Sequence, residues 1–299
     1  MLTDMHIAIV GGDARQLEVI RKLSELDGKL SLIGFDQLDD GFVGAKKQTF
    51  QTLDPSTVDA IILPISGMNQ DGEVESIFSG EKTIFPENWL ESTKKNTKLY
   101  TGISNERLKS MASDAKLELL ELMERDDVAI YNSVPTAEGT IMMVIQNTDI
   151  TIHNANIIVT GLGRVGMTIA RTFKNLGGKV EVVANEPELR ARALEMNMNS
   201  YPVESLPKCV RKADIIINTI PAKILTVDVL SRMPPHTLVV DIASKPGGTD
   251  FRYAEKRGIK ALLAPGLPGI VAPKTAGQII AKVLSTLLLE QWENKGGKN

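Results

Sequence analysis

The sequence predicts an α/β protein with two doubly wound parallel sheets, the second of them a Rossmann dinucleotide-binding domain. Short apolar runs of strand type alternate with helical patterns along the whole chain. The alternation falls into two blocks, before and after about residue 150, and 299 residues suffice for two domains. Strands that are joined through helices pair in parallel with right-handed crossovers. Within the second block, residues 156–166 run from an apolar strand directly into Gly-x-Gly-x-x-Gly.

The first domain, residues 1–133, is predicted to be a flavodoxin-like α/β domain. Its expected strands are residues 6–10, 30–35, 59–63, 99–101 and 117–119, and its expected helices are residues 14–26 and 106–115. Ile20 and Leu23 belong to the buried stripe of the first of these helices. The Gly-Gly-Asp turn at residues 11–13 lacks the third glycine of a nucleotide fingerprint. We therefore expect no second nucleotide site in this domain.

A helix over residues 134–150 is predicted to connect the two domains. Pro135 suits the first turn of a helix, and Ser133 or Asn132 can cap it. A cleft between two α/β domains is a common place for a small substrate, so we expect the substrate near this helix.

The second domain, residues 151–270, contains the glycine motif. Its expected strands are residues 156–160, 179–184, 215–218, 238–242 and 259–264, with helices after the motif and over residues 186–196. Gly161 permits the tight turn, Gly163 lets a pyrophosphate approach the backbone, and Gly166 lets the helix pack on the strand. A glycine-rich turn without a ligand is the alternative, but the flanking strand and helix favour a dinucleotide site. The predicted contacts are Gly161, Leu162, Gly163, Arg164, Val165 and Gly166.

The last segment, residues 271–299, is predicted to be mainly a long amphipathic helix. Ile280, Val283 and Leu287 lie on one side of the pattern at helical spacing. We expect this helix to pack back on the N-terminal domain.

Three loops at the predicted carboxyl ends of the second sheet are rich in glycine and proline: residues 218–223, 243–250 and 265–275. Such residues fix the backbone and allow close approach, although ordinary turns also use them. Ligands of open α/β sheets bind at this edge. We therefore expect the loops to form walls of the nicotinamide and substrate site. The cofactor contacts predicted there are Thr219, Ile220, Pro221, Ala243, Gly266 and Pro268.

The residues after the second strand of the glycine-motif domain bear on the choice of cofactor. Ala184 stands where a carboxylate usually binds the ribose of NAD, which leaves room for the 2′-phosphate of NADP. Asn185 can contact that phosphate, Glu186 would repel it, and Arg190 and Arg192 are near enough in sequence to compensate. The pattern favours NADP, with NAD as the alternative.

The histidines offer no general base. His6, His153 and His236 each precede or begin a predicted strand, so they lie at the edge opposite the nucleotide. Proton transfer would fall to other groups, with structural roles as the alternative for each. The candidates are Lys245, Glu138 and Asp250, and for Asp250 a helix-capping role is favoured.

Composition excludes several classes of protein. There are 34 Lys and Arg against 37 Asp and Glu, a net charge of −3 without long runs of one sign, so neither nucleic acid nor a membrane surface is an expected partner. No apolar run approaches the length of a membrane span, and no signal peptide is apparent. Cys209 is the single cysteine, most simply a structural thiol. We expect a cytoplasmic protein without a metal site.

Four segments, residues 135–142, 158–173, 243–251 and 264–277, resemble the A-subunit family of dipicolinate synthase from spore-forming bacteria. The resemblance covers essentially the whole chain, and its last two segments are more specific than the glycine motif. It implies NAD(P)-dependent oxidation of dihydrodipicolinate, or its hydrated precursor, to dipicolinate during sporulation. It also implies a location in the mother-cell cytoplasm, with a flavoprotein-like second subunit of dipicolinate synthase as partner.

The implied substrate is a small ring dicarboxylate, which needs cations or helix N-termini. Candidates are Lys245, Lys274 and Thr275, grouped with the second domain, and Arg15 and Arg107 from the first. We also expect a homo-oligomer. Two other functions remain open: another two-domain NAD(P)-dependent amino- or keto-acid dehydrogenase, and a non-catalytic nucleotide-binding subunit of the same complex.

Overall fold

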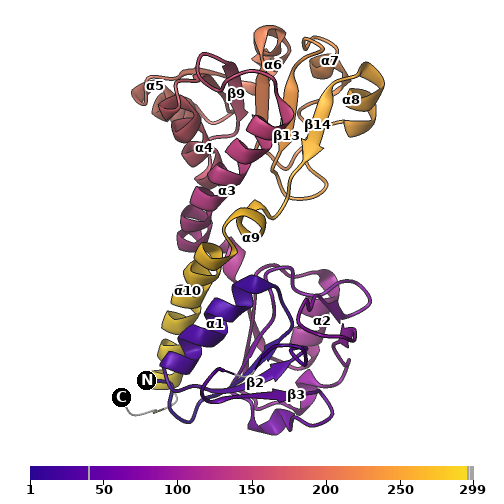
Figure 1. Cartoon of the computed structure of the whole chain (residues 1–299), viewed down its shortest axis with the longest axis vertical. Coiled ribbons are helices and arrows are strands. Elements are labelled where there is room, and N and C mark those ends of the chain that lie inside the picture. Colours follow the sequence, from indigo (N-terminus) through magenta and orange to yellow (C-terminus); the bar gives the residue numbers. More distant parts are fainter. Residues whose placement is uncertain (40, 295, 297–299) are drawn as a thin grey trace. The chain divides into compact units, whose positions relative to one another are not determined.

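The computed structural model describes residues 1–39, 41–294 and 296, which divide into two compact units. The first unit comprises Met1–Ala129 and Ala272–Asn299, and the second comprises Ile130–Val271 (Figure 1). The chain thus leaves the first unit within helix α3 (Asp126–Asn147) and returns just before helix α10 (Pro273–Asn294). Of the segment predicted over residues 271–299, residues 295 and 297–299 lie outside the described residues.

The described residues of the first unit form a six-stranded parallel sheet in the order β3-β2-β1-β4-β7-β8. Its strands are β1 (His6–Val10), β2 (Lys29–Ile33), β3 (Ala45–Gln48), β4 (Ala60–Ile62), β7 (Lys98–Thr101) and β8 (Glu118–Glu121). The flavodoxin-like prediction is corrected by β3, which completes the Rossmann order. Its sequence, Ala-Lys-Lys-Gln, has the charged character of an edge strand and no apolar run, so periodicity missed it.

Helices cover both faces of this first sheet. Helices α1 (Ala14–Glu25) and α10 lie side by side on one face (Figure 1). Their buried residues, including Ile20 and Leu284, pack with those of β1 in one core. Helix α2 (Glu106–Asp114) covers the other face. The small antiparallel pair β5 (Glu73–Val74) and β6 (Thr83–Ile84), which the sequence did not indicate, lies between β4 and β7 in the chain.

The second unit repeats this topology. Its described residues form a six-stranded parallel sheet in the order β11-β10-β9-β12-β13-β14. The strands are β9 (Asn156–Thr160), β10 (Lys179–Val183), β11 (Asn199–Tyr201), β12 (Ile215–Asn218), β13 (Leu238–Asp241) and β14 (Lys260–Leu263). Five of them are within one residue of the predicted bounds, whereas short β11 was missed. The predicted fold class, two doubly wound parallel sheets, is confirmed.

Helices also cover the second sheet on both faces. Helix α4 (Arg164–Asn175) packs with α3 on one face, where Ser133 Oγ and Thr168 Oγ1 are 2.7 Å apart. The opposite face is covered by α6 (Leu206–Cys209), α7 (Val227–Leu230) and α8 (Phe251–Arg257). Two further helices, α5 (Pro187–Glu195) and α9 (Leu267–Val271), follow β10 and β14 in the chain. No helix in the described part of the chain is long and apolar enough to cross a membrane.

The start predicted for the connecting helix is wrong. Helix α3 begins at Asp126 rather than near residue 134, and Pro135 lies inside it rather than in its first turn. Two aspartates in the first turn favour the helix dipole at the true start. Because Pro135 has no N–H, one backbone acceptor loses its partner. Nearby hydroxyls donate to carbonyls of the preceding turn, Ser133 Oγ to Ile130 O at 2.6 Å and Thr136 Oγ1 to Asn132 O at 2.8 Å.

Candidate functional site

The glycine turn between β9 and α4 is held by close packing at two of its glycines. Gly161 has a φ of +86°, and a Cβ there would lie 2.4 Å from Thr219 Oγ1. At Gly166 a Cβ would lie 2.2 Å from the carbonyl oxygen of Gly161. Leu162 between them is fully buried and anchors the turn in the core. Gly161 and Gly166 are therefore required by the protein's own packing.

Gly163 is different, because a Cβ built there would meet nothing within 4 Å. It is the N-cap residue of α4 and provides no side-chain hydrogen bond to the helix, whose first turn contains no acidic residue. The N-terminus of a 12-residue helix is thus uncapped by any carboxylate and faces open space. A helix N-terminus of this kind binds phosphate through backbone N–H groups and the helix dipole. The residues present fit the pyrophosphate of a dinucleotide.

At the end of β10, the position predicted for the ribose is buried and uncharged. Ala184 is 1% exposed, and its N–H donates to Tyr201 O at 3.0 Å. Arg190 folds back onto this strand end, where its Nη1 donates to Ala184 O at 2.9 Å and to the carbonyl of Asn185. Arg192 instead forms an exposed ion pair of 3.1 Å within its own helix. Of the two predicted arginines, therefore, Arg190 lies at the strand end.

The carboxyl ends of three neighbouring strands each carry a fully buried polar residue that sequence reasoning missed. Thr160 ends β9, Asn218 ends β12 and Asp241 ends β13, all with no exposed surface. Thr160 Oγ1 donates to Asn218 Oδ1 at 2.6 Å, and Asn218 Nδ2 donates to Asp241 Oδ1 at 2.9 Å. The available signal was a single polar residue closing each of three apolar strands, at the edge where ligands bind.

Asp241 is the centre of this network. Its Oδ1 also accepts from the Ala243 N–H at 3.2 Å, and its Oδ2 accepts from the Gly248 N–H at 2.8 Å and from Thr249 Oγ1 at 2.6 Å. Four donors therefore satisfy the two carboxylate oxygens. The effect is to fix both ends of the loop that contains Lys245.

Two of the three predicted loop walls are joined to each other. Gly248 O accepts from the N–H groups of Ile224 and Leu225 at 3.1 and 3.0 Å. Lys223 Nζ lies 3.0 Å from Asp250 Oδ2, and the hydrogen bond from Lys223 lowers the pKa of that carboxyl. Asp250 also caps α8 by accepting from the Tyr253 N–H at 3.1 Å. Its role is thus the structural one that the sequence favoured.

The two predicted catalytic side chains are both exposed. Lys245 lies on the loop fixed by Asp241 and has no ion pair among the described residues. Glu138 lies within α3, next to Gly139, which packs against Leu267 of α9. Gly266, with a φ of +72° and open space around its Cβ position, precedes α9.

The substrate candidates Lys274 and Thr275 belong to the first unit, not to the second as predicted. They are exposed residues of the first turn of α10, and this helix packs into the first core because its apolar face matches α1. Arg15 forms a two-pronged ion pair with Asp13, the shortest distance being 2.6 Å. Arg107 lies 3.0 Å from a Glu87 oxygen and donates to Gln70 O at 2.9 Å. Both arginines already have acceptors of their own.

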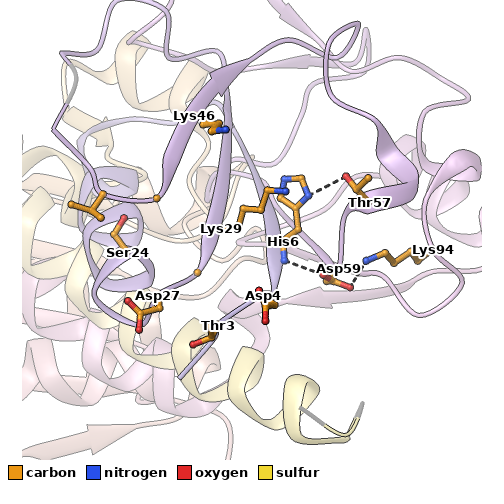
Figure 2. A pocket seen from close by; sticks show the side chains of 13 residues that line it. Thr3, Asp4, His6, Ser24, Asp27, Lys29, Lys46, Thr57, Asp59 and Lys94 are labelled. Atoms are coloured by element: carbon orange, nitrogen blue, oxygen red, sulfur yellow. Dashed lines mark hydrogen bonds and ion pairs between the residues drawn. The ribbon is translucent and has the colours of Figure 1, made fainter. Parts of the chain in front are cut away.

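A cavity of about 570 Å³ lies away from these residues, at the amino ends of the first unit's strands (Figure 2). His6 in its wall bonds to Thr57 Oγ1 at 3.0 Å and Ser31 Oγ at 2.7 Å. Burial, reinforced by the charge of Lys29, lowers the pKa of His6, so the ring is neutral at pH 7. Asp59 in the same wall is paired with Lys94 at 2.7 Å. The described residues contain no cluster of three or more metal-binding side chains here or elsewhere.

Two doubly wound sheets, one with an open phosphate-binding turn, define a protein of the two-domain dehydrogenase type. Comparison with protein families agrees, since residues 129–299 match the alanine dehydrogenase/PNT C-terminal domain. Residues 6–123 match the N-terminal domain of the dipicolinate synthase A subunit.

Full-length relatives define the family more narrowly. The chain is 54% identical over 296 residues to the dipicolinate synthase A subunit of Bacillus subtilis (strain 168), covering 99% of this chain and 100% of the relative. The crystal structure of the Bacillus halodurans protein has a TM-score of 0.94 at 59% identity, covering 96% of this chain and 99% of that one. The B. subtilis structure has a TM-score of 0.95 at 54% identity, covering 98% and 99%. The chain belongs to the A-subunit family of dipicolinate synthase.

Proposed function

We propose that this chain oxidises dihydrodipicolinate, or its hydrated precursor, to dipicolinate with NADP or NAD as hydride acceptor. The carrying observation is the open, uncapped helix N-terminus at Gly163 in a chain 54% identical over its length to a dipicolinate synthase subunit. The fold of both units is that of dehydrogenases, which supports an oxidoreductase. A nucleotide site on a dehydrogenase fold and a relative named for making an aromatic ring point to the same chemistry.

The proposed contacts to the cofactor follow from the geometry of the second unit. Backbone N–H groups at the start of α4 bind the pyrophosphate, with Gly163 leaving the space. Arg190 lies where a 2′-phosphate would extend, which favours NADP. The joined loops containing Thr219 and Ala243 form the wall beside the nicotinamide, since ligands lie at this edge of such sheets.

The proposed reaction needs little acid–base chemistry. Loss of a hydride and a proton from the dihydropyridine ring leaves an aromatic dicarboxylate, so aromaticity supplies much of the driving force. When bound, the cofactor accepts the hydride. Lys245 pairs with one ring carboxylate, and Lys245 or Glu138 accepts the proton. Lys274 and Thr275 are more available to a second carboxylate than Arg15 or Arg107, which have partners already.

We further propose that the chain works with a flavoprotein-like second subunit, as a homo-oligomer, in the cytoplasm of the sporulating mother cell. One observation favours a second function, a nucleotide-binding subunit whose partner carries the chemistry. All three histidines lie at the amino edges of the sheets: His6 begins β1, while His153 and His236 precede β9 and β13. No imidazole therefore reaches the proposed cofactor edge.

The two functions are separated by single-turnover measurements. The purified chain is mixed with NADP⁺ or NAD⁺ and freshly generated dihydrodipicolinate, with and without the second subunit, and reduced cofactor is followed by absorbance at its own band. Reduction by this chain alone, lost in Gly163→Val, supports the oxidoreductase. Reduction that needs the partner but survives Gly163→Val would assign the chemistry to the partner.

A further inference from the structure

Asp241 is a buried carboxylate without a cation to balance it. It is 0% exposed, and among the described residues it forms no ion pair. Its four partners are the Asn218 amide, the Ala243 and Gly248 N–H groups and the Thr249 hydroxyl, all formally neutral. Burying an ion without a counter-ion is costly even when its hydrogen bonds are satisfied. A neutral side chain could tie the same loops at lower cost, so the charge itself needs an explanation.

The hydrogen-bond directions fit the ionised form of Asp241. Asn218 is oriented by its other contacts, since its Oδ1 accepts from Thr160 Oγ1 and from the Ile220 N–H at 3.1 Å. Its Nδ2 therefore faces Asp241 as a donor. Backbone N–H groups also donate to each carboxylate oxygen, so neither oxygen is placed to donate a proton to them.

The position of this charge is as informative as its burial. Asp241 ends β13, beside β12, and lies directly beneath the loops that carry Thr219 and Lys245. Under the proposed function, on which this inference rests, these loops adjoin the nicotinamide. The nicotinamide ring carries a positive charge when oxidised and none when reduced. A fixed negative charge in a site of low dielectric therefore acts on one redox state of the ring and not on the other.

We propose that Asp241 makes the site selective for the oxidised cofactor. The charge strengthens binding of the oxidised ring and is without a partner once the ring has accepted hydride, which favours release of the reduced cofactor. Asp241 also positions the loop of Lys245, but that effect applies to both redox states alike. The ratio of the two dissociation constants consequently reports on the charge and not on the loop.

The test is equilibrium titration of the full-length chain with the oxidised and reduced forms of whichever cofactor, NADP or NAD, the wild type binds more tightly. Asp241→Asn removes the charge and should raise the ratio of oxidised to reduced Kd by about five-fold or more. Thr249→Val is the matched control, because it removes a hydrogen bond to the same oxygen without changing charge. It should shift both constants together and leave their ratio unchanged.

The wild type provides a second measurement in case Asp241→Asn does not fold. It should bind the oxidised form at least about three-fold more tightly than the reduced form. Equal or reversed affinities in the wild type, or an unchanged ratio in a folded Asp241→Asn, would overturn this proposal while leaving the proposed function in place. If neither form binds the wild type, the proposed function fails and this proposal fails with it.

Discussion

The two sheets offer a natural comparison, because the same turn follows the first strand of each. Helix α1 begins four residues after Val10, helix α4 begins four residues after Thr160, and both helices have 12 residues. The N-cap residue is Asp13 in the first unit and Gly163 in the second. Topology, loop length and helix length are thus matched, and the residues of the turn differ.

In the first unit the turn is filled by the protein's own groups. Asp13 accepts from the Arg15 N–H at 2.9 Å and caps the helix with a carboxylate. A Cβ at Gly12 would lie 2.1 Å from Cγ of Gln16, the residue that corresponds to Gly166. The N–H of Gly12 donates to Glu75 O at 2.6 Å. A carboxylate therefore occupies the place that an anionic ligand would take at the open turn of the second unit.

This difference teaches that the Rossmann topology alone does not define a dinucleotide site. The N-cap residue decides whether the helix dipole is satisfied internally or is left for a ligand. Substitutions at matched positions of the two turns can therefore break or sharpen the comparison.

The largest effect is expected from making the second turn resemble the first. Gly163→Asp should weaken NADP and NAD binding about 100-fold or more, since an internal carboxylate would replace and repel the phosphate. The fold should be retained or slightly stabilised, because aspartate is a good N-cap. Gly163→Val, which fills the space without charge, should also abolish binding. Cofactor titration and thermal unfolding measure the two effects.

The control for both variants is Gly41→Val in the first unit. Gly41 likewise has nothing within 4 Å of its Cβ position and no left-handed φ. This variant should bind cofactor as the wild type does. Wild-type affinity in Gly163→Asp would show that the open turn is not the phosphate site.

Gly166→Ala separates a glycine needed for packing from one needed for the ligand. A Cβ there would lie 2.2 Å from a backbone oxygen, so the substitution should lower the free energy of unfolding by about 1–3 kcal/mol. Chemical denaturation compares it with Gly163→Val, which should cost far less stability. Equal stability losses in the two variants would remove this distinction between the glycines.

The next prediction contrasts an unpaired cation of the second unit with a paired one of the first. Lys245→Met should reduce substrate use about ten-fold or more, or about 1.4 kcal/mol, with little change in cofactor affinity. Arg107→Met is the comparison, because Arg107 already pairs with Glu87 and should matter less to the substrate. Steady-state kinetics with the second subunit present would contradict the assignment if Lys245→Met behaved as the wild type.

Asp13 provides a pH-dependent test in the first unit. Burial tends to raise the pKa of Asp13, but the hydrogen bond and charge of Arg15 outweigh it and lower the pKa below its ordinary value of 3.8. The capping contribution is thus complete above the ordinary pKa and is lost as pH falls through the folded-state pKa. Asp13→Ala should cost about 1 kcal/mol at pH 7.

Denaturation of the wild type and Asp13→Ala at pH 7 and near pH 3 measures this contribution. The gap between their unfolding free energies should narrow at the lower pH, while cofactor affinity at pH 7 stays unchanged. A gap independent of pH would mean that the carboxylate does not cap α1 as an ion.

The smallest effect concerns the choice of cofactor. Arg190→Ala should weaken NADP binding about five-fold, as for a partly exposed charge pair, and leave NAD nearly unchanged. Arg192→Ala is the matched control, since Arg192 pairs with Glu195 and should affect neither cofactor. Equal losses for NADP and NAD in Arg190→Ala would argue against a 2′-phosphate contact.

Much of the fold could be predicted because buried strands leave a strong apolar signal. β9 and β12 were located by runs such as Ile157–Val159, which pack on both faces. β3 and β11 were missed because edge strands need fewer apolar residues. The start of α3 was misplaced because Pro135 is usually a first-turn residue, and tertiary packing overrode that preference.

The candidate site was predictable where local geometry dictates residue type. Gly161 and Gly166 are fixed by contacts within one turn, so a short motif suffices to recognise them. The Asp241 network joins residues from three strands and becomes visible only when the strands are placed side by side. The placement of Lys274 failed for a similar reason, since packing of α10 on α1, not sequence order, decides which unit it joins.

The most direct test of the central claim is a crystal structure of the full chain soaked with NADP⁺. We predict one dinucleotide per chain, with its pyrophosphate on the N–H groups at the start of α4 and nothing at the Asp13 turn. Density for a pyrophosphate at the Asp13 turn, or a fully bound dinucleotide that avoids Gly163, would contradict the account.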